Sequence, residues 1–274
     1  MLRPAADPAT SARALAALQA GAQAAWQALV PHEPALVVEV VPSLDSTNAE
    51  LLRRARSAGG PATLLAAVEQ TAGRGRAGRR WVTLPGASLA FSLGLPLQPT
   101  DWSGLSLVVG VALAQALPAG VRLKWPNDLW WQGRKLGGIL IETAIAPHGR
   151  YAVIGVGLNL ATPVLPPDAP LQAIPPIGLD DVCTATGTPQ RDPGGWLARL
   201  APALLHAVRR FEADGFAPWR AQFGALDALA GQRVRTSDGL EGIAEGVDDD
   251  GALRLRTPHA VVRVQAGDVS VRPC

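Results

Sequence analysis

The chain has 274 residues, 48% of them hydrophobic and 18% charged, a composition that is typical of a folded protein and excludes a disordered chain. Its length allows one large domain, or one large and one small domain. The formal net charge of +2 indicates no strongly basic surface for nucleic acid, and two cysteines and four scattered histidines predict neither a disulfide nor a metal site.

The first part of the chain, residues 1–34, is rich in alanine and predicts a helical extension bounded by Pro31 and Pro34. It contains no signal-peptide pattern. The longest apolar helical stretch, residues 105–117, is far shorter than the roughly 20 residues that a membrane-spanning helix needs. We therefore expect a cytoplasmic protein with no membrane partner.

The central part, residues 35–228, mixes strands and helices without strict alternation, which predicts an α+β domain with a mixed or antiparallel sheet. Thr47 and Glu50 form a capping-box pattern that predicts the start of a helix, which Gly59-Gly60-Pro61 ends. Further helices are predicted over residues 102–117 and 196–211. Strands are predicted over residues 36–41, 63–68, 88–95, 121–125, 136–142 and 151–158, and the proline-rich segment 161–176 is predicted to be a loop.

The last part, residues 229–274, has a different pattern of short strands separated by turns. Asp238-Gly239 and Asp250-Gly251 are typical turn sequences. The strands are predicted over residues 232–236, 240–246, 252–256 and 260–264. This pattern predicts a small SH3-like β-barrel, which is too small to be very stable alone and is expected to pack on the central domain.

Lysine is rare in this chain: among 25 basic residues only Lys124 and Lys135 are lysines, and they lie within twelve residues of each other. A site that needs a compact ammonium group cannot accept the wide, planar guanidinium of arginine. The pair therefore predicts a reaction centre that handles phosphate or carboxylate. The alternative, which the spacing does not exclude, is that both are solvated surface lysines that lie close together by chance.

A loop rich in glycine and arginine lies between the predicted strands 63–68 and 88–95. Its segment Gly73-Arg-Gly-Arg-Ala-Gly78 matches the G-x-G-x-x-G dinucleotide pattern, but no helix start follows it and the next acid is Asp101, so a dinucleotide site is rejected. Glycine amides and four arginines suit a phosphate or carboxylate, although a solvated turn explains the loop equally well. The final Trp81 predicts either stacking on a ligand ring or core packing. We expect residues 70–81 to become ordered when an anionic ligand binds.

Several segments, taken in order, resemble the biotin–protein ligase family from about Leu44 to the end of the chain. They are Asp45-Ser-Thr-Asn48, Gln70, Gly73-Arg-Gly-Arg-Ala-Gly-Arg-Arg-Trp81, Lys124-Trp-Pro-Asn-Asp128, Arg134-Lys-Leu-Gly-Gly-Ile139 and Gly155-Val-Gly-Leu-Asn159. The resemblance implies a class II synthetase-like catalytic ligase domain followed by the SH3-like barrel. It also implies that ATP and biotin, assisted by Mg²⁺, form biotinyl-5′-AMP, from which biotin passes to a lysine of a biotin carboxyl carrier protein of acetyl-CoA carboxylase or a related carboxylase.

The resemblance further implies roles for individual residues. Those expected to bind the ureido head of biotin and its surroundings are Ser46, Thr47, Asn48 and Gln70. Those expected in the rest of the biotin slot and its closing loop are Gly73, Arg74, Gly75, Arg76, Gly138, Ile139, Gly155 and Gly157. Those expected to face the nucleotide are Arg76, Arg79, Trp81, Asn127 and Asn159. Those expected at the reacting centre are Lys135, which would reach the biotin carboxylate, together with Arg76, Asp128 and Lys124.

Two departures from the family pattern bear on function. Ala77 stands where some relatives carry another arginine, so retention of the adenylate is expected to be weaker. The part before Leu44 is too short for the DNA-binding domain of the bifunctional members, so a monofunctional ligase without specific DNA binding is expected. A biotin-responsive transcription regulator and a lipoate–protein ligase remain the alternatives, and the sequence leaves open whether the protein is a monomer or a homodimer.

Overall fold

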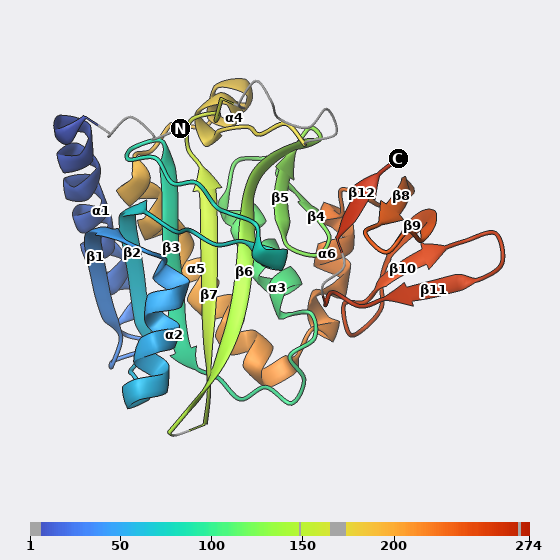
Figure 1. Ribbon diagram of the computed structural model, residues 1–274, viewed down its shortest axis with the longest axis horizontal. Helices are drawn as coiled ribbons and strands as arrows, with labels where there is room; N and C mark the ends of the chain where they lie inside the picture. Colours follow the sequence, from blue (N-terminus) through green and yellow to red (C-terminus); the bar gives the residue numbers. More distant parts are fainter. Residues whose placement is uncertain (1–6, 148, 165–173, 268–269) are drawn as a thin grey trace.

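The computed structural model describes residues 7–147, 149–164, 174–267 and 270–274 (Figure 1). At its centre is a seven-stranded sheet with the order β1-β2-β3-β7-β6-β5-β4. Strands β1 and β2 run parallel and the other neighbours are antiparallel, which confirms the mixed sheet and the α+β class. The strands are β1 (Val37–Leu44), β2 (Thr63–Gln70), β3 (Ser88–Pro96), β4 (Arg122–Lys124), β5 (Asp128–Trp131), β6 (Arg134–Ala146) and β7 (Gly149–Asn159).

Helices cover both faces of this sheet. One face packs under α1 (Pro8–Leu29), α3 (Leu105–Ala116) and α5 (Pro193–Asp214), and the opposite face carries α2 (Thr47–Ala58) (Figure 1). Side chains alternate between the faces along each strand, so Phe91 and Leu93 of β3 enter the main core while Ser92 points toward α2. On the α2 face, Leu65, Tyr151 and Val153 pack in a smaller second core under the helix.

Helix α1 is part of the main core, because it crosses α5 at an unusually close contact. A Cβ atom on Gly21 would lie 2.1 Å from the carbonyl oxygen of Gly194, and a Cβ atom on Gly194 would lie 1.8 Å from that of Ala17. Only glycine allows the two backbones to approach this closely. Leu18 and Leu29 of α1 are buried in the same cluster as the sheet. The division of the chain at residues 34 and 228 stays a prediction.

The C-terminal module is a separate antiparallel sheet with the order β11-β10-β9-β8-β12. Its strands, and the short helices that lead into it, are η2 (Ala217–Trp219), α6 (Arg220–Leu226), β8 (Arg233–Thr236), β9 (Glu241–Val247), β10 (Leu253–Arg256), β11 (Val261–Val264) and β12 (Val271–Pro273). The indole nitrogen of Trp125 donates to the carbonyl oxygen of Gly251 at 3.0 Å, and Arg220 Nε donates to that of Val247 at 2.8 Å. These bonds join the module to the central domain.

Some elements differ from the predictions. Helix α3 begins at Leu105 and not at residue 102, because Gly104 with φ 81° precedes it in a left-handed conformation. Four short strands and α-helices were not predicted: β5, α4 (Leu179–Thr186), α6 and β12. Residues 165–173 of the predicted loop 161–176 lie outside the described residues. Within the described ranges, no helix is long and apolar enough to cross a membrane.

Candidate functional site

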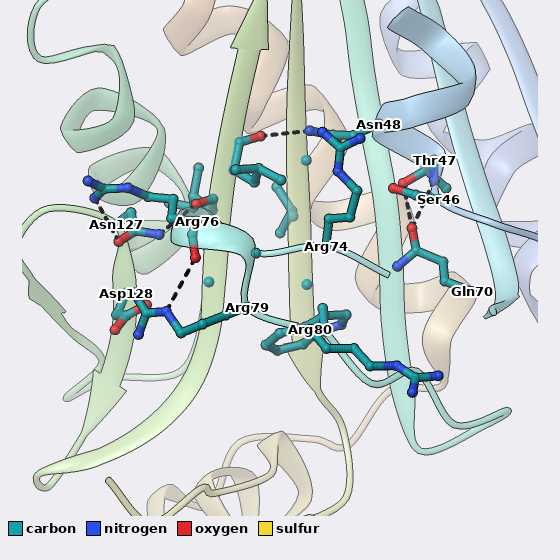
Figure 2. Close-up of a pocket in the computed structure, with 18 of the residues that line it drawn as sticks. Ser46, Thr47, Asn48, Gln70, Arg74, Arg76, Arg79, Arg80, Asn127 and Asp128 are labelled. Atoms are coloured by element: carbon teal, nitrogen blue, oxygen red, sulfur yellow. Dashed lines mark hydrogen bonds between the residues drawn. The ribbon is translucent and has the colours of Figure 1, made fainter. Parts of the chain in front are cut away.

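A cavity of about 260 Å³ lies on the α2 face of the sheet, between the strands and the glycine–arginine loop. Figure 2 shows Ser46, Thr47 and Gln70 on one side of it and Asn127 and Asp128 on the other. The residues that line the cavity are Ser46, Thr47, Asn48, Gln70, Arg74, Gly75, Arg76, Arg79, Arg80, Trp81, Phe91, Asn127, Asp128, Lys135, Gly138, Ile139, Leu140, Gly155, Val156 and Gly157.

The first end of the cavity is polar and uncharged, and it begins where α2 begins. The predicted capping box is wrong, because the N-cap is Ser46 and Glu50 pairs with arginines of α2. The Thr47 amide donates to Gln70 Oε1 at 2.8 Å, and the Thr47 hydroxyl lies 3.1 Å from the same atom. Thr47 therefore joins the helix start to the end of β2 and leaves the capping task to its neighbour.

Ser92 completes this polar end and was not predicted as a site residue. Its hydroxyl lies 2.6 Å from Thr47 Oγ1 and 2.7 Å from Asn48 Oδ1. The Ser92 hydroxyl therefore lies within hydrogen-bond distance of two acceptors, Thr47 Oγ1 and Asn48 Oδ1, and its single hydrogen can serve one of them at a time. Since Asn48 Nδ2 donates to the Leu140 carbonyl oxygen at 3.1 Å, the amide of Asn48 is held in one orientation.

Glycines form the floor of the cavity because the strand register brings them together. Gly157 pairs with Gly138 across β7 and β6, and Gly155 pairs with Ser92 across β7 and β3. A Cβ atom on Gly157 would lie 2.5 Å from the Trp81 ring, and one on Gly155 would lie 2.2 Å from Asn48 Oδ1. The floor thus requires residues without side chains, which suits a flat ligand.

The second end of the cavity carries charge. Lys135 Nζ lies 2.7 Å from Asp128 Oδ1, and Lys124 Nζ lies 3.5 Å from Asp128 Oδ2. Burial opposes ionisation of Asp128, but the charges of Lys135 and Lys124 outweigh it and hold the pKa of this carboxyl below its usual value. Burial also lowers the pKa of Lys124, with Asp128 opposing that shift. Lys135 is the more exposed lysine, and it lines the cavity.

The glycine–arginine loop closes the cavity from above. The Trp81 amide donates to the Gly73 carbonyl oxygen at 2.9 Å, and the Gly75 amide donates to that of Arg79 at 2.7 Å, so the loop folds back on itself. A turn of 3₁₀ helix, η1 (Arg76–Gly78), forms its tip. Figure 2 shows the loop crossing between the polar and the charged ends. These hydrogen bonds hold residues 73–81 together as a small hairpin.

The loop arginines bind groups that are distant in sequence or belong to the loop itself, and Arg79 Nε donates to the Arg76 carbonyl oxygen at 3.3 Å. Arg76 Nη1 donates to Asn127 Oδ1 at 3.2 Å, and Arg76 also contacts the carbonyl oxygens of Ala266 and Gly267 in the C-terminal module. Arg80 donates to the Thr71 carbonyl oxygen at 3.1 Å. Arg74 forms an ion pair with Glu142 of β6. The loop is thus connected to the sheet and to the C-terminal module.

The structure brings together around this cavity all but three of the residues that the sequence singled out. Gly73 supports the loop from below Trp81, and Lys124 lies buried behind Asp128. Asn159 Nδ2 lies 3.3 Å from the carbonyl oxygens of both Lys135 and Ile177, so it positions the start of β6. Ser92 and Glu142 were missed, and their signal is the two-residue period that puts them on the ligand side of their strands.

Within the described residues, no three side chains of histidine, cysteine, aspartate or glutamate are grouped as metal ligands. Asp128 is the carboxylate that lines the cavity, and two ammonium groups already contact it. This donor set does not form a protein cage for a divalent ion. It fits a Mg²⁺ ion that keeps phosphate oxygens and water as its main ligands.

Comparison with known proteins agrees with this arrangement. Residues 40–159 match the model of the biotin/lipoate A/B protein ligase family, and residues 230–272 match that of the biotin protein ligase C-terminal domain. A biotin–[acetyl-CoA-carboxylase] ligase of Paracoccus denitrificans is 39% identical over 82% of this chain and 96% of its own. That of Mycobacterium tuberculosis is 34% identical over 91% of both chains. The fold is similar to that of biotin protein ligase from Aquifex aeolicus, with TM-score 0.71 and 24% identity over 87% of this chain and 99% of the other.

Proposed function

The chain belongs to the biotin/lipoate A/B protein ligase family, and from this premise we propose that it is an ATP-dependent biotin–protein ligase. It joins biotin to AMP and then transfers the biotinyl group to a lysine of a biotin carboxyl carrier protein. The names of its relatives support a carrier protein of acetyl-CoA carboxylase, or of a related carboxylase, as the acceptor. Since the reaction consumes ATP, we place it in the cytoplasm.

The observation that carries this proposal is the contrast between the two ends of the cavity. Hydroxyl and amide groups of Ser46, Thr47 and Gln70 suit an uncharged head with N–H and C=O groups, such as the ureido ring of biotin. Lys135 and Arg76 at the other end suit a carboxylate and the phosphates of a nucleotide. The glycine floor between them suits the flat body of biotin.

In the first step, a carboxylate oxygen of biotin attacks the α-phosphorus of ATP and the bond to the β-phosphate breaks, which gives biotinyl-5′-AMP and pyrophosphate. Both reactants are anions, so positive charge must be in place before they meet. Lys135 is positioned for this by Asp128 at 2.7 Å, and Arg76 by Asn127 at 3.2 Å. A Mg²⁺ ion bound together with ATP would supply further neutralising charge on the phosphates.

In the second step, the amine of the acceptor lysine attacks the biotinyl carbonyl carbon, and AMP leaves with the electron pair of the broken bond. We assign Asp128 a positioning role in this step. Its pKa lies below the usual value because two ammonium groups face it, and a carboxylate with a lowered pKa is a weak proton acceptor. Asp128 instead keeps Lys135 pointed toward the reacting oxygens.

The decisive experiment incubates the protein with Mg·ATP, a carrier domain, and either biotin or lipoate. We expect the carrier to gain the mass of one biotin and no lipoyl group. The polar end of the cavity supports this choice, because its hydroxyl and amide groups can pair with ureido groups, which lipoate lacks. Lipoylation without biotinylation would replace this function with that of a lipoate ligase, and no modification by a folded protein would refute both.

Binding of biotin is expected to slow hydrogen exchange of the loop over residues 70–81. The loop crosses the cavity, and a carboxylate or phosphate below it adds charge that its arginines can bind. The amides of Gly75 and Trp81 are the reporters, because each donates within the loop. Exchange that is unchanged by saturating biotin, while α2 shows protection, would contradict stabilisation of the loop by the bound ligand.

A further inference from the structure

Glu142 of β6 connects the polar end of the cavity to the loop that covers it. Its Oε2 accepts from Asn48 Nδ2 at 2.9 Å, and its Oε1 forms an ion pair with Arg74. It does not itself line the cavity between α2 and the charged end. Figure 2 shows the Arg74 guanidinium beside Asn48, the two groups that Glu142 joins.

The burial of Glu142 and Asn48 separates this cluster from an ordinary surface ion pair, whose contribution to stability is small. Only 22% of the Glu142 side chain is exposed and Asn48 is buried, whereas 48% of the Arg74 side chain is exposed. Both hydrogens of the Asn48 amide are used, one by Glu142 and one by the Leu140 carbonyl oxygen. The carboxylate therefore cannot turn to follow Arg74 without leaving a buried donor unsatisfied.

The Glu142 carboxylate is fixed in orientation. Asn48 binds one of its oxygens on the sheet side, so the other oxygen presents negative charge to Arg74 of the loop. Arg74 lies one residue after Gly73, at the base of the hairpin whose amides bond within the loop. An ion pair at the base of a hairpin restrains the whole hairpin, because the residues beyond it move together.

We propose that Glu142 is a positioning residue that latches the glycine–arginine loop over the cavity before any ligand arrives. The same contact orients Asn48, so that loop closure and the shape of the polar end depend on one carboxylate. Its effect on biotin retention rests on the proposed function, whereas the latch itself does not.

The first test measures hydrogen exchange of the ligand-free protein. In Glu142→Gln the amide oxygen can still accept from Asn48, but the charge facing Arg74 is lost. We expect the Gly75, Arg79 and Trp81 amides to exchange roughly fivefold faster, which corresponds to about 1 kcal/mol of lost closure. The matched control is Glu39→Gln: Glu39 also lies on a strand of this sheet, is 34% exposed and pairs with Arg54 of α2 at 2.7 Å, far from the loop. It should leave loop exchange unchanged.

A double-mutant cycle then separates the latch from a general loss of stability. Arg74→Gln should accelerate loop exchange as much as Glu142→Gln, and combining the two should add nothing further. Melting temperatures should stay equal across the set. Additive effects, equal acceleration by Glu39→Gln, or no acceleration at all would each overturn the proposal.

The last readout is the dissociation rate of biotin, which Glu142→Gln should raise roughly fivefold while Glu39→Gln leaves it unchanged. Faster loop exchange with unaltered biotin dissociation would overturn the claim that the latch retains the ligand. Failure of the wild-type protein to bind biotin would refute the proposed function instead, and the ligand-free exchange data would still decide the latch.

Discussion

Replacing Gly155 with alanine is expected to weaken biotin binding about a hundredfold, which corresponds to about 2.7 kcal/mol. The added Cβ would lie 2.2 Å from Asn48 Oδ1, which is far shorter than a van der Waals contact. Asn48 is the side chain that must yield, because Gly155 belongs to the central strand β7 and its backbone is held on both sides. The expected loss lies within the range of roughly 1–3 kcal/mol that overpacking costs.

The loss should appear in affinity and also in stability. In the free protein the Asn48 amide can move toward the cavity, but it then weakens its hydrogen bonds to Leu140 and Glu142. Biotin needs the same space, so binding must push the amide back against the new methyl group. The measurement is calorimetric titration with biotin, together with a melting curve.

The control for this substitution is Gly60→Ala, since nothing lies within 4 Å of a Cβ atom at Gly60. It should bind biotin with unchanged affinity. If Gly155→Ala bound biotin as tightly as the wild-type protein, then Asn48 would have to lie outside the biotin site, and the assignment of the polar end would be wrong.

Replacing Lys135 with arginine is expected to slow adenylate formation at least about tenfold, or about 1.4 kcal/mol of lost transition-state stabilisation. The substitution preserves the positive charge, so a simple field effect predicts little change. The ammonium of Lys135 is compact and lies 2.7 Å from Asp128 Oδ1, whereas a guanidinium is wide and planar. A displacement of about 1 Å at a reacting centre costs far more than the retained charge restores.

The stability of the protein should barely respond, because 29% of the Lys135 side chain is exposed and the larger group has space to turn. The companion substitution Lys124→Arg provides the contrast. Lys124 is only 5% exposed and lies 5.5 Å from the centre of the Trp130 ring, so a guanidinium there should lower the melting temperature. The rate of adenylate formation is measured as single-turnover release of pyrophosphate. A normal rate for Lys135→Arg would show that the site needs only a positive charge.

The sequence by itself determined the strands and long helices of the central domain, because their hydrophobic periods and terminating glycines are local signals. Its ordered motifs, through their resemblance to biotin–protein ligases, also predicted most of the residues that line the cavity, although Lys124 lies buried behind Asp128. The strands β5 and β12, the helix α6 and the two 3₁₀ turns, η1 and η2, all have seven residues or fewer and escaped prediction. Elements this short carry too few residues to show a period.

Only the tertiary structure decided how those residues act together. Thr47 has the sequence of a helix cap, yet its amide and hydroxyl turn to Gln70, a residue that folding brings to it from the end of β2. Arg74 lies in a stretch without acids, residues 70–100, and its partner Glu142 is on β6, 68 residues away. Nothing in the local sequence distinguishes Ser92, and it is the fold that places its hydroxyl beside Thr47 and Asn48. Hydrogen bonds and ion pairs of this kind depend on distance in space, which strand pairing fixes and which no local pattern of residues contains.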